Sequence, residues 1–471
     1  MAVGTVMLVA CGKSNSPPAE RELVRPSLPH SIAGPAPVED PDVQRSTAEV
    51  EAGFEQARLE LEHSASLDLI AQLALVGKLA FYDVALSVDR NQACATCHLP
   101  SAGFSGGVSS YNQTSVAYPG SVQRFGGRRP PTAAYATMAP QFHWDGNQQD
   151  FYGGNFWDMR ATGDHLGNAA ADQAIGPPVN ALEMGISDPA CVVYRISKSS
   201  YRRLFELVWG ETSFAIRWPD DTDRVCEKPA VPGGAPSPLR LVELDRSVAT
   251  TTYNHLGVAI ANYEFSSEVS AFSSKLDAVL AGHATLTAQE QRGWDLFHGK
   301  ANCAQCHLDG SAPGTAPADV QRPLFTDFSS LNLGIPANPD MPLYNAAQPD
   351  LGVGEFLRGV VEWAPLAPKY TGKFRVPTVR NADKRPRADF VKAYMHNGYL
   401  KSLKEVVHFY NTSQTLPRCA HGSPGEKVQC WPAPEVADNV NSNLLGNLLL
   451  TDAEEDDVVA FLQTLTDGFT H

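Results

Sequence analysis

Apolar residues recur at spacings of three and four along much of the chain, which is the pattern of helices that bury one face. Continuous alternation of apolar and polar positions, the mark of strands, is scarce. The spacing predicts helices at residues 48–61, 67–81, 199–209, 241–263, 403–410 and 452–465. Thr287 and Glu290 have the spacing of a capping box, which predicts the start of one more helix. The pattern therefore predicts a mainly α fold.

Composition and net charge add three expectations to this pattern. The 37 glycines and 35 prolines are scattered along the chain, which predicts long irregular loops between the helices. A chain of 471 residues with 43% hydrophobic residues has enough apolar material for two or three domain cores. The formal net charge of -15, with no stripe of Lys and Arg, argues against a nucleic-acid partner.

The N-terminal segment has the features of an export signal. Residues 1–10 are nearly all apolar or small, and residues 8–11 resemble a lipoprotein processing box in which Cys11 becomes the lipidated N-terminus. Residues 14–47 are rich in Pro, Ser, Ala and acidic residues without an apolar period, which is typical of a flexible tether. We therefore expect residues 1–47 to be signal and tether, and the protein to lie in the periplasm or at the cell surface, attached to a membrane only by this lipid. The alternative is a poorly ordered tail with a chance cysteine.

Two Cys-x-x-Cys-His motifs carry the clearest chemistry of the chain. In a c-type site, two thiols three positions apart bind the vinyl groups of a haem, and the adjacent imidazole binds the iron. A zinc site would need a second pair of ligands nearby, and a thioredoxin-like redox motif would need a surrounding βαβ pattern. The motifs predict two covalently bound haem c groups, held by Cys94, Cys97 and His98 and by Cys303, Cys306 and His307.

Four further cysteines remain once Cys11 and the two motifs are assigned. The most economical pairing joins Cys191 to Cys226 and Cys419 to Cys430. An even remainder in a chain with an export signal indicates an oxidising compartment. The alternative is four unrelated buried thiols, since cysteine is common in protein cores.

The segments before the two motifs are alike. Residues 77–81 read Gly-Lys-Leu-Ala-Phe and residues 293–297 read Gly-Trp-Asp-Leu-Phe, both in predicted helices. Each half therefore looks like a cytochrome c unit whose leading helix packs near its own motif. We predict an N-terminal cytochrome c-like domain at residues 48–265 and a C-terminal one at residues 266–471.

From about Leu67 to Leu465 the chain resembles the bacterial dihaem cytochrome c peroxidase / MauG family. The resemblance is carried by separate blocks in the order of the family, namely residues 77–81 with the first motif, 156–161, 173–183, 325–327, 377–381 and 395–398. It implies an oxidoreductase that reduces hydrogen peroxide at the N-terminal haem with electrons delivered through the C-terminal haem. The partner would be a small electron donor, such as a cytochrome c or a cupredoxin, or a protein substrate that is oxidised in the manner of MauG. The alternative is a non-catalytic dihaem electron-transfer lipoprotein.

The resemblance also implies roles for single residues at the first haem. Gln173, Pro177 and Glu183 fall at the spacing of the distal pocket in the family, and Glu183 is the expected acid/base for peroxide cleavage. Trp157 lies in a block like the one that carries the tryptophan between the two haems. Trp144 lies in a similar-looking Trp-Asp pair and is the competing candidate.

At the second haem, the position of the distal ligand corresponds to Tyr410, with Met395 or His408 as alternatives. Axial ligands set the redox potential of a haem, so this residue decides the chemistry of the site. Calcium, a further cofactor of the family, stays an expectation without assigned ligands. Arg129 stands where the family usually has asparagine, and an arginine is a poor neighbour for a hard cation.

Overall fold

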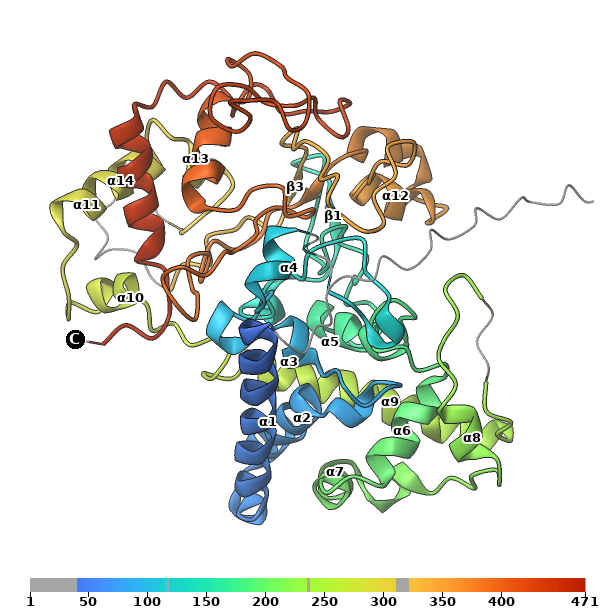
Figure 1. Ribbon diagram of the computed structural model, residues 1–471. Coiled ribbons are helices and arrows are strands. Elements are labelled where there is room, and N and C mark those ends of the chain that lie inside the picture. Colours follow the sequence, from blue (N-terminus) through green and yellow to red (C-terminus); the bar gives the residue numbers. More distant parts are fainter. Residues whose placement is uncertain (1–39, 115, 117, 235–237, 311–321, 471) are drawn as a thin grey trace, which may run out of the picture. The chain divides into compact units, whose positions relative to one another are not determined.

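The computed structural model describes residues 40–114, 116, 118–234, 238–310 and 322–470 (Figure 1). This part of the chain is mainly helical, as the apolar spacing predicts, with long irregular connections and little sheet. The helices are α1 (Pro41–Leu61), α2 (Leu69–Tyr82), α3 (Cys94–Cys97), α4 (Ser109–Gln113), α5 (Ala169–Ala174), α6 (Pro189–Ser197), α7 (Arg202–Trp209), α8 (Thr222–Cys226), α9 (Glu243–Phe265), α10 (Lys275–Leu280), α11 (Ala288–His298), α12 (Val353–Arg358), α13 (Leu403–Thr412) and α14 (Asp452–Gln463). Antiparallel pairs are formed by β1 (His143–Asp145) with β2 (Asp150–Tyr152) and by β3 (Ser330–Leu331) with β4 (Phe374–Arg375).

The six helices predicted from apolar spacing are present as α1, α2, α7, α9, α13 and α14, and the capping box starts α11. At that box, Glu290 N donates to the Thr287 hydroxyl at 3.2 Å, and Thr287 N donates to the Glu290 carboxylate at 2.7 Å. The other helices were not predicted, since most have too few residues to show a helical period.

The start of α1 corrects the expected tether. The helix begins at Pro41, with Asp40 as its N-cap, so residues 41–47 are helical and the boundary predicted at residue 47 is wrong. Asp42 is buried, where it accepts a hydrogen bond from Ser109 N at 3.0 Å and pairs with Arg387 at 2.5 Å. Polar contacts, and not an apolar face, hold the first turn of α1. The spacing of apolar residues therefore did not indicate a helix there. Cys11 lies outside the described residues, and within them no helix is long and apolar enough to cross a membrane.

Two helix pairs repeat the same packing in the two halves. α2 packs against α9, and α11 packs against α14. At each crossing a glycine allows the backbones to touch, since a Cβ on Gly77 would lie 2.0 Å from Ala259 O and a Cβ on Gly293 would lie 2.0 Å from Asp457 O. Four residues after each glycine a phenylalanine, Phe81 or Phe297, is buried in the core. The sequence similarity between residues 77–81 and 293–297 therefore reflects the same helix packing in the two halves.

The two largest clusters of buried apolar side chains divide near the predicted domain boundary. One is formed mainly by residues 50–272 and the other by residues 276–465. Contacts also cross between them, because Phe390 packs in the first cluster and the Tyr135 hydroxyl donates to Asp467 at 2.6 Å. The boundary between residues 265 and 266 stays a prediction.

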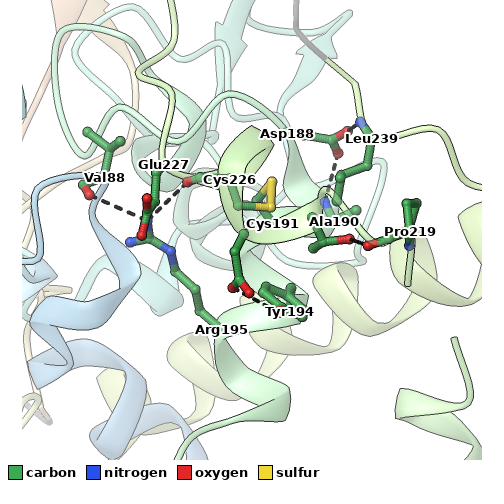
Figure 2. Close-up of a disulfide and its surroundings, with 12 residues drawn as sticks. Val88, Asp188, Ala190, Cys191, Tyr194, Arg195, Pro219, Cys226, Glu227 and Leu239 are labelled. Carbon is green, nitrogen blue, oxygen red and sulfur yellow. Dashed lines mark hydrogen bonds between the residues drawn. A yellow bond between two sulfur atoms is a disulfide. The ribbon is translucent and has the colours of Figure 1, made fainter. Parts of the chain in front are cut away.

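Both expected disulfides are present, Cys191–Cys226 and Cys419–Cys430. The first joins α6 to α8, and Figure 2 shows Arg195 beside it. The Arg195 guanidinium donates to Cys226 O at 3.1 Å and to Ala85 O at 2.8 Å. Through this arginine, the disulfide-linked segment is tied to the loop that leads into the first haem motif.

Candidate functional site

The first Cys-x-x-Cys-His motif lines a cavity with its two thiols and its imidazole, which we call the first cavity. α3 places both cysteines on one helical turn, and neither forms a disulfide. The His98 Nδ1 donates to Phe104 O at 3.1 Å, which leaves Nε2 as the nitrogen available to a metal. Burial lowers the pKa of His98, so the imidazole stays neutral and able to ligate.

The second motif repeats this arrangement in another cavity, which we call the second cavity. The His307 Nδ1 donates to Phe325 O at 3.0 Å, and burial again lowers the pKa of the imidazole. The two residues whose carbonyl oxygens accept these bonds match closely in backbone conformation, since Phe104 has φ 55° and Phe325 has φ 54°. Each half therefore offers what a covalently bound haem needs. It has two free thiols, a neutral imidazole whose Nδ1 is hydrogen-bonded, and a largely apolar cavity wall.

Three residues predicted for the distal pocket lie together in the first cavity with His98. They are Gln173 at the end of α5, Pro177 in the following turn, and Glu183. Burial raises the pKa of Glu183 to about 7, against the opposing effect of the nearby Arg160 charge. A carboxyl group with this pKa exchanges protons readily near neutral pH.

Several charged residues of the first cavity could not be recognised from the sequence, Arg160 and Glu264 among them. Arg160 stacks on the Phe156 ring at 3.8 Å and donates to both oxygens of Asp158, at 2.8 and 2.7 Å. Glu264 is 4% exposed, and burial raises the pKa of its carboxyl group to about 8. The signal for Glu264 was its place one helical turn after the apolar Ile260, on the buried face of α9.

Trp157 lies between the two haem sites, because its side chain borders both cavities. It is 7% exposed, and its Nε1 donates to Arg129 O at 2.9 Å, which fixes the orientation of the indole. The competing Trp144 lies in β1 and packs against Phe151 in a separate cluster. It borders neither cavity.

The three candidate ligands of the second haem are separated by the structure. Tyr410 and Met395 border the second cavity together with His307, whereas His408 does not. Both ring nitrogens of His408 have protein partners, Glu455 at 2.9 Å and Val428 O at 3.2 Å. Burial raises the pKa of Tyr410, and no described residue forms a hydrogen bond with its hydroxyl. Which residue ligates the iron stays a prediction.

The position at which calcium was considered is occupied by the Arg129 side chain. Its Nε donates to Met395 O at 3.2 Å, and its guanidinium lies 5.6 Å from the Trp157 ring centre. In the described part of the chain, no group of three or more His, Cys, Asp or Glu side chains could hold a metal ion. The expectation of calcium therefore has no support from these residues.

Known proteins show what this architecture is similar to. The chain is 32% identical over 398 residues to the methylamine utilization protein MauG of Paracoccus denitrificans, covering 84% of this chain and 88% of MauG. It is 26% identical over 410 residues to the cytochrome-c peroxidase IdrP1 of a Pseudomonas species, covering 84% and 81% of the two chains.

Among solved structures, the diheme peroxidase BthA of Burkholderia thailandensis superposes with a TM-score of 0.64 at 28% identity, covering 84% of this chain and 86% of that one. The sequence profile of the family described as "Di-haem cytochrome c peroxidase" matches residues 71–285. The family implies two c-type haems, in agreement with the two motifs and their cavities. The chain belongs to the di-haem cytochrome c peroxidase / MauG family of oxidoreductases.

Proposed function

We propose that the protein reduces hydrogen peroxide at the first haem and receives the electrons through the second haem. The observation that carries this proposal is the half-buried Glu183 carboxyl group, which lines the same cavity as His98 and whose pKa is raised. The balanced reaction consumes one peroxide, two protons and two electrons and gives two water molecules. The haem supplies an iron that binds peroxide and exchanges electrons.

Glu183 handles the protons of this reaction. Its carboxylate would accept a proton from one oxygen of the peroxide and return it to the other oxygen, which would leave as water. Gln173 and Arg160 border the same cavity and orient the peroxide by hydrogen bonding. Pro177 shapes the wall without offering an N–H donor.

Trp157 is proposed to pass electrons between the two haems. Its indole borders both cavities and is held by Arg129 O, so its position relative to the two histidines is fixed. Tyr410 is proposed as the distal ligand of the second iron, with Met395 as the remaining competitor. A phenolate ligand lowers the potential of a haem, which favours oxidation of a difficult substrate.

The electrons come from a small donor protein, such as a cytochrome c or a cupredoxin, or from a protein substrate oxidised in the MauG manner. The similarity to MauG supports the second source, and the similarity to cytochrome-c peroxidases supports the first. The proposed location is the periplasm or the cell surface, with a lipid on Cys11. The two disulfides support an exported protein, because disulfides form in oxidising compartments. The two c-type motifs support the same location.

Glu183→Gln tests the proposed reaction because it keeps the shape of the side chain and removes its proton exchange. We expect both haems to be retained while peroxide turnover falls by about 10²- to 10⁴-fold. Glu264→Gln, at a buried carboxyl of the same cavity, is the matched control and should cost less than about tenfold. Equal losses in the two variants would assign the effect to the charge of the cavity rather than to proton transfer by Glu183.

The pH profile gives an independent measurement. Because the pKa of Glu183 is raised to about 7, the carboxyl is protonated below this pH and becomes the active base above it. The kcat/KM for peroxide should therefore rise with pH through about 7, and this rise should be absent in Glu183→Gln. A profile that is flat between pH 6 and 8 in the wild type would contradict the role. A non-catalytic electron carrier would instead show two low-spin six-coordinate haems and no turnover.

A further inference from the structure

Two arginines that border the second cavity have no acidic partner. In the described residues, neither Arg375 nor Arg129 forms an ion pair, although both side chains are partly buried at the cavity wall. Burial lowers the pKa of each to about 10, and no carboxylate counteracts this effect. A buried cation without an anion costs several kcal/mol, so it is retained only where an anion is supplied.

Two other arginines that line the cavities, Arg128 and Arg380, do have acidic partners. Arg128, next in sequence to Arg129, pairs with Asp158 and Asp350 at 2.6 Å each. Arg380, whose side chain is 0% exposed, pairs with Asp277 at 2.5 Å. Arg128 and Arg380 are therefore neutralised by carboxylates of the chain, whereas Arg129 and Arg375 are not.

Arg375 lies in β4, and its backbone N donates to Trp157 O at 2.8 Å. Its guanidinium centre lies 5.5 Å from the Phe328 ring centre. The Nε atom is fully buried and has no hydrogen-bond partner in the described structure. A buried N–H donor is nearly always paired in folded proteins, so this orphaned donor indicates a missing acceptor.

Arg129 contacts the same tryptophan, with its guanidinium 5.6 Å from the ring centre. Its carbonyl accepts the Trp157 Nε1 hydrogen bond, and its own Nε donates only to Met395 O at 3.2 Å. Its side chain borders the first cavity as well as the second. The remaining donors of this guanidinium are therefore available to a ligand at the wall between the two haem sites.

The acidic groups of the cavity are already engaged. Asp350 binds Arg128, and Glu435 accepts from Asp350 N at 3.0 Å and lies 3.7 Å from His396 Nε2. Lys392 also borders the second cavity, but its Nζ donates to three backbone carbonyls at 2.8 to 3.0 Å. Two guanidinium groups therefore remain without an anion at the cavity that would hold the haem. A guanidinium group can bind a carboxylate through two parallel hydrogen bonds.

We propose that Arg375 and Arg129 bind the propionate carboxylates of the haem attached to the second motif. A haem carries two propionates, and the two arginines supply two cationic forks beside Trp157. This inference rests on a haem at the second motif and not on peroxide chemistry. It therefore stands or falls independently of the proposed reaction.

The test is the reduction potential of each haem, measured by a spectroelectrochemical titration of the holoprotein without peroxide. Removing a buried positive charge disfavours the reduced iron, so Arg375→Gln should lower the ratio of reduced to oxidised second haem at least tenfold at a fixed applied potential. Tenfold corresponds to 59 mV for a one-electron couple. The first haem should change less than the second. Arg129→Gln should lower the ratio at both haems, because Arg129 borders both cavities.

Two further variants separate carboxylate binding from general effects. Arg375→Lys keeps the charge and should hold the ratio within about threefold of the wild type. Arg292→Gln removes the same charge from a side chain that is 59% exposed on α11 in the same half, and should change it less than twofold. Equal shifts in Arg375→Gln and Arg292→Gln, or no shift in Arg375→Gln, would overturn the proposal. If Arg375→Gln loses the second haem and Arg375→Lys keeps it, carboxylate binding is supported. If both variants lose the haem, Arg375 is needed for folding and the proposal is overturned.

Discussion

The two haem sites share the residues that attach the haem and differ in the other residues that line their cavities. In each half a glycine-containing helix crosses a partner helix, a Cys-x-x-Cys-His motif follows, and a phenylalanine carbonyl holds the histidine Nδ1. Besides His98, the first cavity is lined by proton-exchanging and hydrogen-bonding groups, Glu183 and Gln173 among them. Near His307, the second cavity offers Tyr410 and Met395 among mainly apolar side chains.

Under the proposed function, this difference lets one scaffold support two tasks. Thioether attachment and the proximal histidine depend on local geometry that is repeated with little change, down to the φ angles of Phe104 and Phe325. The proposed chemistry depends on residues that differ between the two cavities, such as Glu183 in a loop and Tyr410 on α13. Variants made in matched pairs, one in each half, therefore separate attachment from chemistry.

The largest expected effect is the removal of attachment in one half at a time. Cys94→Ala with Cys97→Ala should yield a protein with one covalent haem and with peroxide turnover at the background level. Cys303→Ala with Cys306→Ala should also leave one covalent haem, while peroxide still changes the spectrum of the remaining first haem. Mass spectrometry and a haem stain of denatured protein give the count. Two covalent haems in either double variant would refute the assignment of that motif.

The next effect concerns the difference between the two distal sides. Tyr410→Met offers a thioether from the same helical position, and thioether ligation favours the ferrous state. The potential of the second haem should rise by roughly 0.1–0.3 V, within the ~0.8 V range that axial ligands span. The potential of the first haem should stay nearly constant.

A redox titration of both haems measures this shift. Tyr399→Phe is the matched control, since that buried tyrosine donates to Glu426 and does not border the cavity. Met395→Leu tests the competing ligand. A spectrum that changes in Met395→Leu but not in Tyr410→Met would transfer the role to Met395.

The parts of the molecule that could be predicted from sequence are those with a local signal. The spacing of two thiols and a histidine within five residues defines each attachment site, and the Thr287 and Glu290 pair defines the start of α11. Long amphipathic helices such as α9 show a period over many residues. The two disulfides followed from counting the cysteines left over.

The parts that could not be predicted depend on contacts between distant residues. The first turn of α1 is held by Arg387, which is 345 positions away in sequence. The block containing Trp157 and the one containing Trp144 look alike in sequence, and only the tertiary structure shows which indole borders the cavities. That Arg375 lacks an acidic partner, whereas Arg380 has one, is likewise a property of the folded chain.

The disulfides provide a smaller comparison of the two halves. Cys191–Cys226 spans 35 positions and Cys419–Cys430 spans 11. Because a longer closed loop restricts the unfolded chain more, replacing the first pair by serine should lower the free energy of unfolding by about 4 kcal/mol. Replacing the second pair should lower it by about 3 kcal/mol. Denaturant titration under oxidising conditions measures both, and a larger loss from the second pair would contradict the loop-length argument.

The smallest expected effect tests whether the helix crossings are equivalent. Alanine normally stabilises a helix interior relative to glycine by about 1 kcal/mol. At Gly77 and Gly293 the added Cβ would lie 2.0 Å from a backbone carbonyl of the partner helix, which cannot move aside as a side chain could. Each alanine variant should therefore lower the free energy of unfolding by about 1–3 kcal/mol, the usual range for overpacking.

Gly146→Ala, with no atom within 4 Å of its added Cβ, is the control and should change the free energy of unfolding by less than about 0.5 kcal/mol. Circular dichroism during denaturation gives the values, and a stabilised Gly77→Ala or Gly293→Ala would show that the crossing in that half opens to admit a side chain.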